Sequence, residues 1–284
     1  MATIVGHGVE VFTPREATRR SSLKGRRLRS PLGIYTSPLI LLIAWEVLCS
    51  TGALSPTLAA SPSQVVSAAA HLWSHGEPST LRADLGISLM RALVGLAIGV
   101  TVGGIAGTFA GLSRLGENVF NGPVQILNTI PFLALLPLFI MWFGIGETSK
   151  IAMISLGAAI PVYINLFGAI RNVDARLIEM ARAAGISRLR MLLRVVLPGA
   201  LPGGLIGLRL AIAYSLLGLV VAEQINANSG IGFMINQAQT FDRIDEMFLG
   251  LVIYAILGLT GDQIVRALER YLLRWRPSSS GSRA

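Results

Sequence analysis

Long apolar runs separated by short polar segments dominate the chain. Six of these runs approach the roughly 20 residues that a helix needs to cross a hydrocarbon core of about 30 Å. They lie at about 34–54, 85–112, 121–143, 150–170, 203–223 and 247–267. The pattern predicts an all-α membrane protein with about six transmembrane helices.

Glycines recur at every fourth position of the second run, as Gly95, Gly99, Gly103, Gly107 and Gly111. Because a helix turns once in 3.6 residues, neighbouring glycines of this ladder lie roughly on one face of the predicted helix. We expect another helix to approach closely there, either in the same subunit or across a dimer. Pro131 and Pro137 in the third run, and Pro161 in the fourth, predict kinks.

The polar segment between the fourth and fifth runs has the pattern of two short helices. Apolar residues recur at helical spacing on both sides of Gly185: Leu177, Met180, Ala181 and Ala184 before it, and Leu189, Leu192, Leu193 and Val196 after it. Gly185 is predicted to end the first helix in a left-handed conformation, Ser187 to cap the second, and Pro198 to end it. We expect an amphipathic, basic hairpin whose apolar face packs against a partner.

Composition supports membrane insertion. Hydrophobic residues make up 52% of the 284 residues and charged residues only 14%. Soluble domains carry roughly 25% charged residues. One cysteine, Cys49, excludes an intrachain disulfide and a cysteine-based zinc site, and three scattered histidines form no ligand cluster. We therefore expect no metal site.

Basic residues are concentrated in alternate segments. Seven precede the first run, six lie between residues 171 and 194 and four follow closely after the sixth run, whereas the other segments carry Arg82, Lys150 and Arg243, one each. By the positive-inside rule, both termini and the hairpin are predicted to be cytoplasmic, and the loops at about 55–83, 144–149 and 224–246 are predicted to face outward. We interpret the net charge of +9 as a topology signal and expect no nucleic-acid partner.

The predicted organisation has three parts. Residues 1–33 form a basic, disordered cytoplasmic arm, residues 34–276 form the transmembrane domain with the hairpin at about 175–198, and residues 277–284 form a disordered tail. Arg19 and Arg20 resemble a twin-arginine export signal. Five further apolar runs favour the cytoplasmic arm instead.

Charged residues within or at the ends of the runs are the candidates for a transport path, because charge in hydrocarbon is costly. They are Glu46, Arg91, Arg209, Glu223 and Asp262. An anion could use Arg91 or Arg209 as a transient counter-charge, with Glu223 on the same path. The alternatives are that Arg209 extends to the membrane surface, that Glu223 belongs to the outer end of its helix, and that Asp262 pairs with Arg266.

The hairpin resembles the EAA loop of permease subunits of ATP-binding-cassette (ABC) importers. The resemblance rests on Glu179-Met180-Ala181, on Gly185, and on Val195-Val196-Leu197-Pro198. In that family the loop lies in a groove of the ATPase subunit and couples ATP binding to the transmembrane helices. The resemblance implies that the ATPase-coupling residues are Glu179, Ala181, Gly185, Leu197 and Pro198.

Further motifs are similar to the nitrate, sulfonate and taurine branch of these permeases, and most of all to aliphatic sulfonate permeases. They lie at 142–150, 168–174, 197–202 and 222–232. The resemblance covers about 33–276 and implies a type I importer permease for a small anionic solute. An aliphatic sulfonate is expected, with taurine, nitrate or another small nutrient as the alternatives.

The resemblance also implies the partners. These are a cytoplasmic ABC ATPase subunit, a periplasmic or surface solute-binding protein, a second permease copy and the lipid of a bacterial cytoplasmic membrane. The chain has no phosphate-binding loop of its own, so ATP and Mg²⁺ are expected on the ATPase, and no catalytic or cofactor-binding residue is expected here. An ion-coupled secondary transporter would need an acidic pair and repeats at the midplane, and an intramembrane enzyme would need a catalytic cluster.

Overall fold

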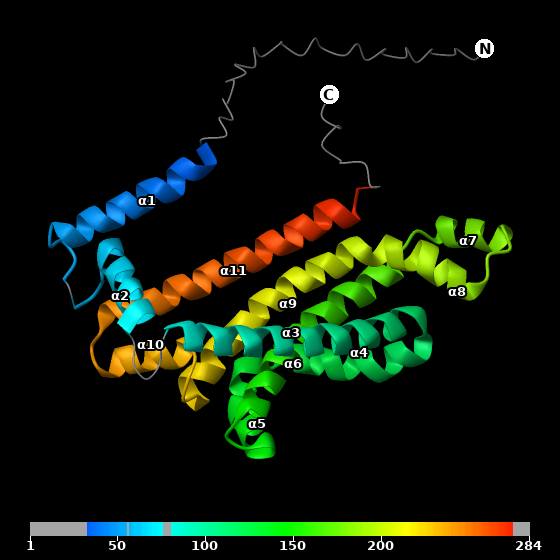
Figure 1. Cartoon of the computed structure of the whole chain (residues 1–284). Helices are drawn as coiled ribbons and strands as arrows, with labels where there is room; N and C mark the ends of the chain where they lie inside the picture. Colours follow the sequence, from blue (N-terminus) through cyan, green and yellow to red (C-terminus); the bar gives the residue numbers. More distant parts are fainter. Residues whose placement is uncertain (1–32, 56, 76–80, 275–284) are drawn as a thin grey trace, which may run out of the picture. The chain divides into compact units, whose positions relative to one another are not determined.

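The computed structural model describes residues 33–55, 57–75 and 81–274, and the regular structure in these ranges is helical (Figure 1). The chain divides into residues 1–42 and 43–284. Of the first unit, only the start of α1 (Gly33–Ser50) is described, so the arm predicted over 1–33 lies, apart from Gly33, outside the described residues, and so does the tail 277–284. The other described helices belong to the second unit.

Four helices of the described chain are long and apolar enough to cross a membrane. They are α3 (Leu81–Leu112), α6 (Glu147–Arg171), α9 (Leu197–Asn226, continuous with the preceding turns from Arg188) and α11 (Ile244–Leu272). A fifth span is counted only if a bent helix pair is taken as one. These helices correspond to the predicted runs 85–112, 150–170, 203–223 and 247–267.

The third predicted span, 121–143, is a broken helix. It consists of α4 (Arg114–Thr129), the 3₁₀ turn η1 (Phe132–Leu135) and α5 (Leu136–Phe143), and its two halves meet at 94°. Pro131 stands at the break, where its missing N–H cannot continue the ladder of α4. The kink predicted there is confirmed, and it is a change of direction rather than a gentle bend.

The first predicted span, 34–54, is shorter than expected. Its apolar helical part, Thr36–Ser50, falls below the length of a membrane-crossing helix, so the described chain holds four or five spans rather than six. The hydroxyl of Thr51 donates to the carbonyl of Val47 at 2.8 Å, and Gly52 follows in the left-handed region with φ +72°. A glycine in this conformation commonly ends a helix.

The glycine ladder of α3 packs against α6 within the same subunit. An added Cβ on Gly95 would lie 2.5 Å from Ile154 Cγ2, and one on Gly107 would lie 3.0 Å from the carbonyl oxygen of Tyr163. An added Cβ on Gly103 would contact the backbone of Ala159. The predicted close approach is confirmed, and the question of subunit or dimer is answered in favour of the subunit.

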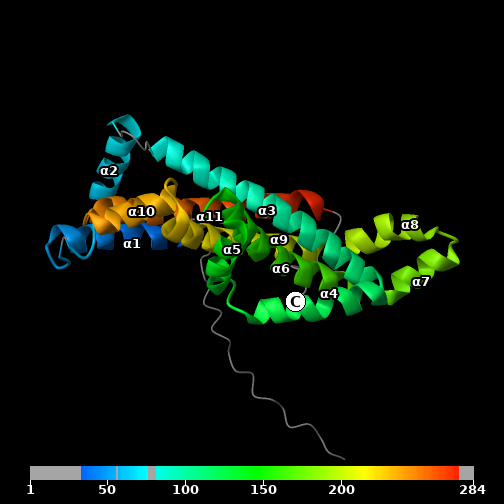
Figure 2. The same cartoon turned by 90° about the horizontal axis from the view of Figure 1, so that it is seen from below.

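Two helices stand where the sequence predicted loops. They are α2 (Pro62–His75) and α10 (Ile231–Thr240), and they pack with α11 around a core that includes Val65, Ile235 and Leu249. Both views place α10 at one end of the long helices and α7 and α8 at the other (Figures 1 and 2). We call these the α10 end and the hairpin end.

Candidate functional site

The hairpin consists of α7 (Ala175–Ala183) and α8 (Arg188–Met191), joined through Gly185. Gly185 has φ +69°, and the next N–H, of Ile186, donates to the carbonyl of Ala181 at 3.1 Å. This is the left-handed helix end that the sequence predicted. Ser187 occupies the N-cap position of α8, but its side chain makes no capping hydrogen bond, so that part of the prediction was wrong.

Pro198 does not end the second helix, contrary to the prediction. The chain continues from α8 through a π-helical turn, Leu192–Val196, into α9, where Pro198 occupies the first turn. A π turn pairs each N–H with the carbonyl five residues earlier, which changes the spacing at the site where proline lacks a donor. The second half of the hairpin is therefore continuous with the transmembrane helix α9.

The hairpin exposes much of its apolar surface. Met180 is 67% exposed and Leu189 66%, while Ala181 and Val196 are buried. Glu179 and Gly185 are also exposed, and Leu197 and Pro198 are half-buried at the start of α9. The exposed apolar side chains lie among arginines, which is typical of a surface that a partner protein covers.

Charged side chains gather at the α10 end instead, and all of them except Glu147 are buried. Arg91 on α3 is 1% exposed and donates to Glu223 on α9 at 2.7 Å and to Glu147 at the start of α6 at 2.6 Å. Lys150, also buried, donates to Glu147 at 2.9 Å. Glu223 is fully buried, and Tyr254 of α11 donates to it at 3.1 Å.

The start of α10 completes this cluster. Its first N–H groups have no partner inside their own helix. The N–H of Gly230 donates to Asp84 at 2.7 Å, that of Ile231 to the hydroxyl of Ser88 at 2.9 Å, and that of Gly232 to Glu223 at 2.9 Å. We call these residues the ionic cluster: Asp84, Ser88, Arg91, Glu147, Lys150, Glu223, Gly230, Ile231, Gly232 and Tyr254.

The structure brings two of the three predicted transport-path residues together. Arg91 and Glu223 form an ion pair in the ionic cluster. Arg209 lies apart, farther along α9 towards the hairpin, and pairs with Asp262 at 3.1 Å and Glu269 at 2.9 Å on α11. Asp262 also accepts from Arg266 at 2.6 Å, as the sequence suggested.

Several members of the ionic cluster were not predicted from the sequence. Asp84, Ser88 and Arg91 lie at positions i, i+4 and i+7 of α3, which places them on one helix face. That polar stripe at the start of an apolar run was the available signal. No local pattern pointed to Glu147 as the bridge between Arg91 and Lys150.

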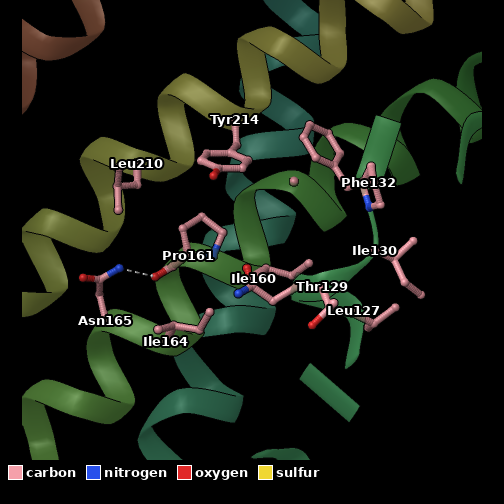
Figure 3. Close-up of a pocket in the computed structure, with 13 residues that line it drawn as sticks. Leu127, Thr129, Ile130, Phe132, Ile160, Pro161, Ile164, Asn165, Leu210 and Tyr214 are labelled. Carbon is pink, nitrogen blue, oxygen red and sulfur yellow. Dashed lines mark hydrogen bonds between the residues drawn. The ribbon is translucent and has the colours of Figure 1, made fainter. Parts of the chain in front are cut away.

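A pocket of about 360 Å³ opens at the break between α4 and η1, with α6 and α9 as its other walls (Figure 3). Its polar side chains are Asn128, Thr129, Asn165 and Tyr214, and none of its lining residues is charged. The amide of Asn165 donates to the carbonyl of Pro161 at 2.9 Å. The sequence did not predict this pocket, although Asn128 and Thr129 interrupt an apolar run.

Phe132 forms one wall of the pocket. An added Cβ on Gly157 of α6 would lie 3.1 Å from its ring, and one on Gly218 of α9 would lie 3.4 Å from it. The ring centroid is 5.7 Å from that of Tyr214. Two glycines on different helices thus make room for one aromatic ring at the helix break.

Residues 86–274 match the protein family described as "Binding-protein-dependent transport system inner membrane component". Two relatives are SsuC permeases, named for aliphatic sulfonate transport. The one from Bacillus subtilis strain 168 is 40% identical over 95% of this chain and 96% of its own length. The one from Escherichia coli strain K12 is 42% identical over 85% of this chain and 90% of its own length. The taurine transport system permease TauC of Escherichia coli strain K12 is 34% identical over 83% of this chain and 86% of its own length.

Solved transporter structures share the fold. The MetNI methionine ABC transporter in an inward-facing conformation has a TM-score of 0.53 and 24% identity, covering 63% of this chain and 92% of that chain. An amino acid ABC transporter with histidines has a TM-score of 0.54 and 19% identity. The match covers 66% of this chain and 92% of that chain. At these identities the likeness shows the type I importer fold alone.

Proposed function

The chain belongs to the family of binding-protein-dependent transport system inner membrane components, and from this premise we propose that it imports an aliphatic sulfonate. It is the permease subunit of an ABC importer and a multi-pass membrane protein. The choice of sulfonate is supported by the SsuC relatives at 40% and 42% identity over most of the chain. Taurine is the second candidate, since a taurine permease is 34% identical.

We further propose the assembly in which it works. Two copies of the chain cross the bacterial cytoplasmic membrane with two ATPase subunits, which bind ATP and Mg²⁺, and with an external solute-binding protein. The hairpin end and both termini face the cytoplasm, and the α10 end faces outward. The arginine asymmetry supports this orientation.

The observation that carries this proposal is the exposed hairpin. Met180 on α7 and Leu189 on α8 are each about two-thirds exposed, and α8 is continuous with α9 through the π turn. We propose that Glu179, Ala181, Gly185, Leu197 and Pro198 couple the ATPase to the helices. Because α8, the π turn and α9 form one continuous helical run, movement of the hairpin moves the wall of the pocket at Tyr214.

The proposed cycle follows from these parts. The loaded binding protein docks on the outer surface, ATP binding closes the ATPase dimer, and the hairpins move with it. Each ligand shifts the equilibrium between inward-open and outward-open states by its preference for one of them.

Reconstitution tests the proposal. The permease, its ATPase and its binding protein are assembled in liposomes that contain ATP, and uptake of labelled ethanesulfonate is measured beside taurine and nitrate. We expect ATP-dependent uptake that requires the binding protein and is highest for ethanesulfonate. Higher uptake of taurine or nitrate would replace the proposed substrate, and uptake without ATP or binding protein would contradict the importer mechanism.

A further inference from the structure

We propose that the pocket beside the helix break is the site that the anion occupies inside the membrane, and that neutral hydrogen-bond donors hold it there. The donors are the amides of Asn128 and Asn165 and the hydroxyl of Tyr214. This inference rests on the proposed function, because it assumes that the solute is a sulfonate or another small anion. It assigns substrate contact to these residues and not to Arg91 or Arg209.

The location of the pocket is the first argument. Ile130 and Pro131, between α4 and η1, have extended backbone within the third apolar run, with ψ of 129° and 104°. At membrane depth, non-helical backbone is stable only where protein buries it or where it lines a water-filled cavity. The pocket is lined by these two residues, so a hydrated solute path at this break satisfies that requirement.

The donor inventory is the second argument. A sulfonate accepts hydrogen bonds through three oxygens and donates none. An asparagine amide offers two N–H groups and a tyrosine offers one O–H. One N–H of Asn165 is used by the carbonyl of Pro161, which leaves the other, and the Tyr214 hydroxyl is directed towards Pro161 across the pocket (Figure 3).

The positions of the cations are the third argument. Arg91 and Lys150 are buried in the ionic cluster, and Arg209 is paired with two carboxylates of α11. Drawing Arg91 away would leave the buried carboxylate of Glu223 without its counter-charge, which is strongly unfavourable. Neither arginine lines the pocket. These three cations are therefore already paired with carboxylates of the fold.

Neutral donors also suit transport. A conducting site must bind its solute well enough to admit it and weakly enough to release it. A buried guanidinium would hold a sulfonate through charge-assisted bonds, which are about twice as strong as neutral ones. A pocket of about 360 Å³ with amide and hydroxyl donors offers brief, weak binding to a short-chain sulfonate.

The test places a negative charge in the pocket with almost no change of shape. Asn128→Asp should reduce ethanesulfonate uptake in the reconstituted system at least tenfold, because the carboxylate repels the anion and removes two donors. Asn128→Ser, which keeps one donor and adds no charge, should retain most of the uptake. Asn118→Asp makes the same chemical change at an exposed position of α4, outside the pocket, and should transport like the wild type.

Tyr214→Phe is the second variant, for the case in which Asn128→Asp fails to assemble. It removes only the hydroxyl and should raise the KM for ethanesulfonate several-fold, with the complex recovered in normal amounts. Wild-type uptake by both Asn128→Asp and Tyr214→Phe would overturn the pocket assignment and leave the proposed function standing. If the wild type imports nitrate instead of a sulfonate, the proposed substrate fails and the same variants are compared on nitrate. If it imports no anion, both proposals fail.

Discussion

The two ends of the long helices differ in which side chains they bury and which they expose. At the α10 end, Arg91, Glu223 and Asp84 are buried and every one of them is paired. At the hairpin end, Met180 and Leu189 are largely exposed. The first arrangement buries charged side chains, and the second exposes apolar side chains.

The difference indicates which end leaves apolar surface for a partner protein to cover. The ionic cluster gives its buried carboxylates and the first N–H groups of α10 hydrogen-bond partners within the chain, although its three carboxylates outnumber its two cations. The hairpin leaves apolar surface uncovered, at a cost of roughly 25 cal/mol for each Å². We infer that the α10 end stabilises the fold and that the hairpin end is built to bind another protein.

The largest expected effect comes from the ionic cluster. Glu223→Gln removes the fully buried one of the two carboxylates that pair with Arg91, and breaking a buried pair from one side costs about 3–5 kcal/mol. We expect a marked drop in the Tm of the purified complex in detergent. Glu147→Gln is the matched control, because the Glu147 side chain is 48% exposed and water can replace part of what is lost. Equal Tm values for the two variants would contradict the inference that the buried pair at the α10 end stabilises the fold.

The glycine ladder packs α3 against α6 between the two ends, and its disruption should have the next largest effect on the complex. Gly103→Leu forces a side chain against the backbone of Ala159, and overpacking of this kind costs about 1–3 kcal/mol. We expect poorer recovery of the complex and reduced uptake. Gly104→Leu adds the same side chain one residue along α3, where an added Cβ meets nothing within 4 Å. Similar recovery of both variants would show that the close contact between α3 and α6 is unimportant.

At the hairpin end, a change in conformation should affect coupling more than stability. Gly185 has a positive φ, and Gly185→Val places a β-branched residue there. The left-handed conformation costs a residue with a Cβ roughly 1–2 kcal/mol, and the strain misplaces α8. We expect loss of the ATP hydrolysis that the loaded binding protein stimulates, with little change in Tm. Gly168→Val, in the helical part of α6 near the same end, has open space around it and should retain stimulation. Normal stimulation of Gly185→Val would remove the hairpin from the coupling mechanism.

The smallest perturbation tests which end faces the cytoplasm. In a Cys49→Ala background, Asn228→Cys at the α10 end and Ser187→Cys in the hairpin place single thiols at exposed positions. An impermeant maleimide should label Asn228→Cys in intact cells and Ser187→Cys only after the membrane is opened. The opposite pattern would reverse the assignment of the two ends.

Features that depend on neighbouring residues were predictable. Gly185 adopts the left-handed conformation because a helix end there needs a residue without a Cβ. The glycine spacing of α3 predicted close packing because it follows the helical repeat. Pro131 predicted a break because proline lacks the N–H that the next turn requires.

Features that depend on wider context were not predictable from local patterns. Proline ends a regular α-helix, yet Pro198 lies in a continuous run because a π turn precedes it. The apolar run 121–143 was predicted as one span because hydropathy carries no information on direction, and its two halves meet at 94°. The loops predicted at 55–83 and 224–246 contain helices whose apolar faces are buried against α11.

By itself, the sequence determined the membrane class, most of the spans, the hairpin and the face on which α3 packs, because these follow from hydropathy, helical repeat and backbone sterics. Only the tertiary structure decided the partners of the charges and the position of the pocket. Arg91 and Glu223 are 132 residues apart, and the pocket joins α4, α6 and α9. Coulomb attraction and cavity shape depend on distance in space, which no local pattern of residues encodes.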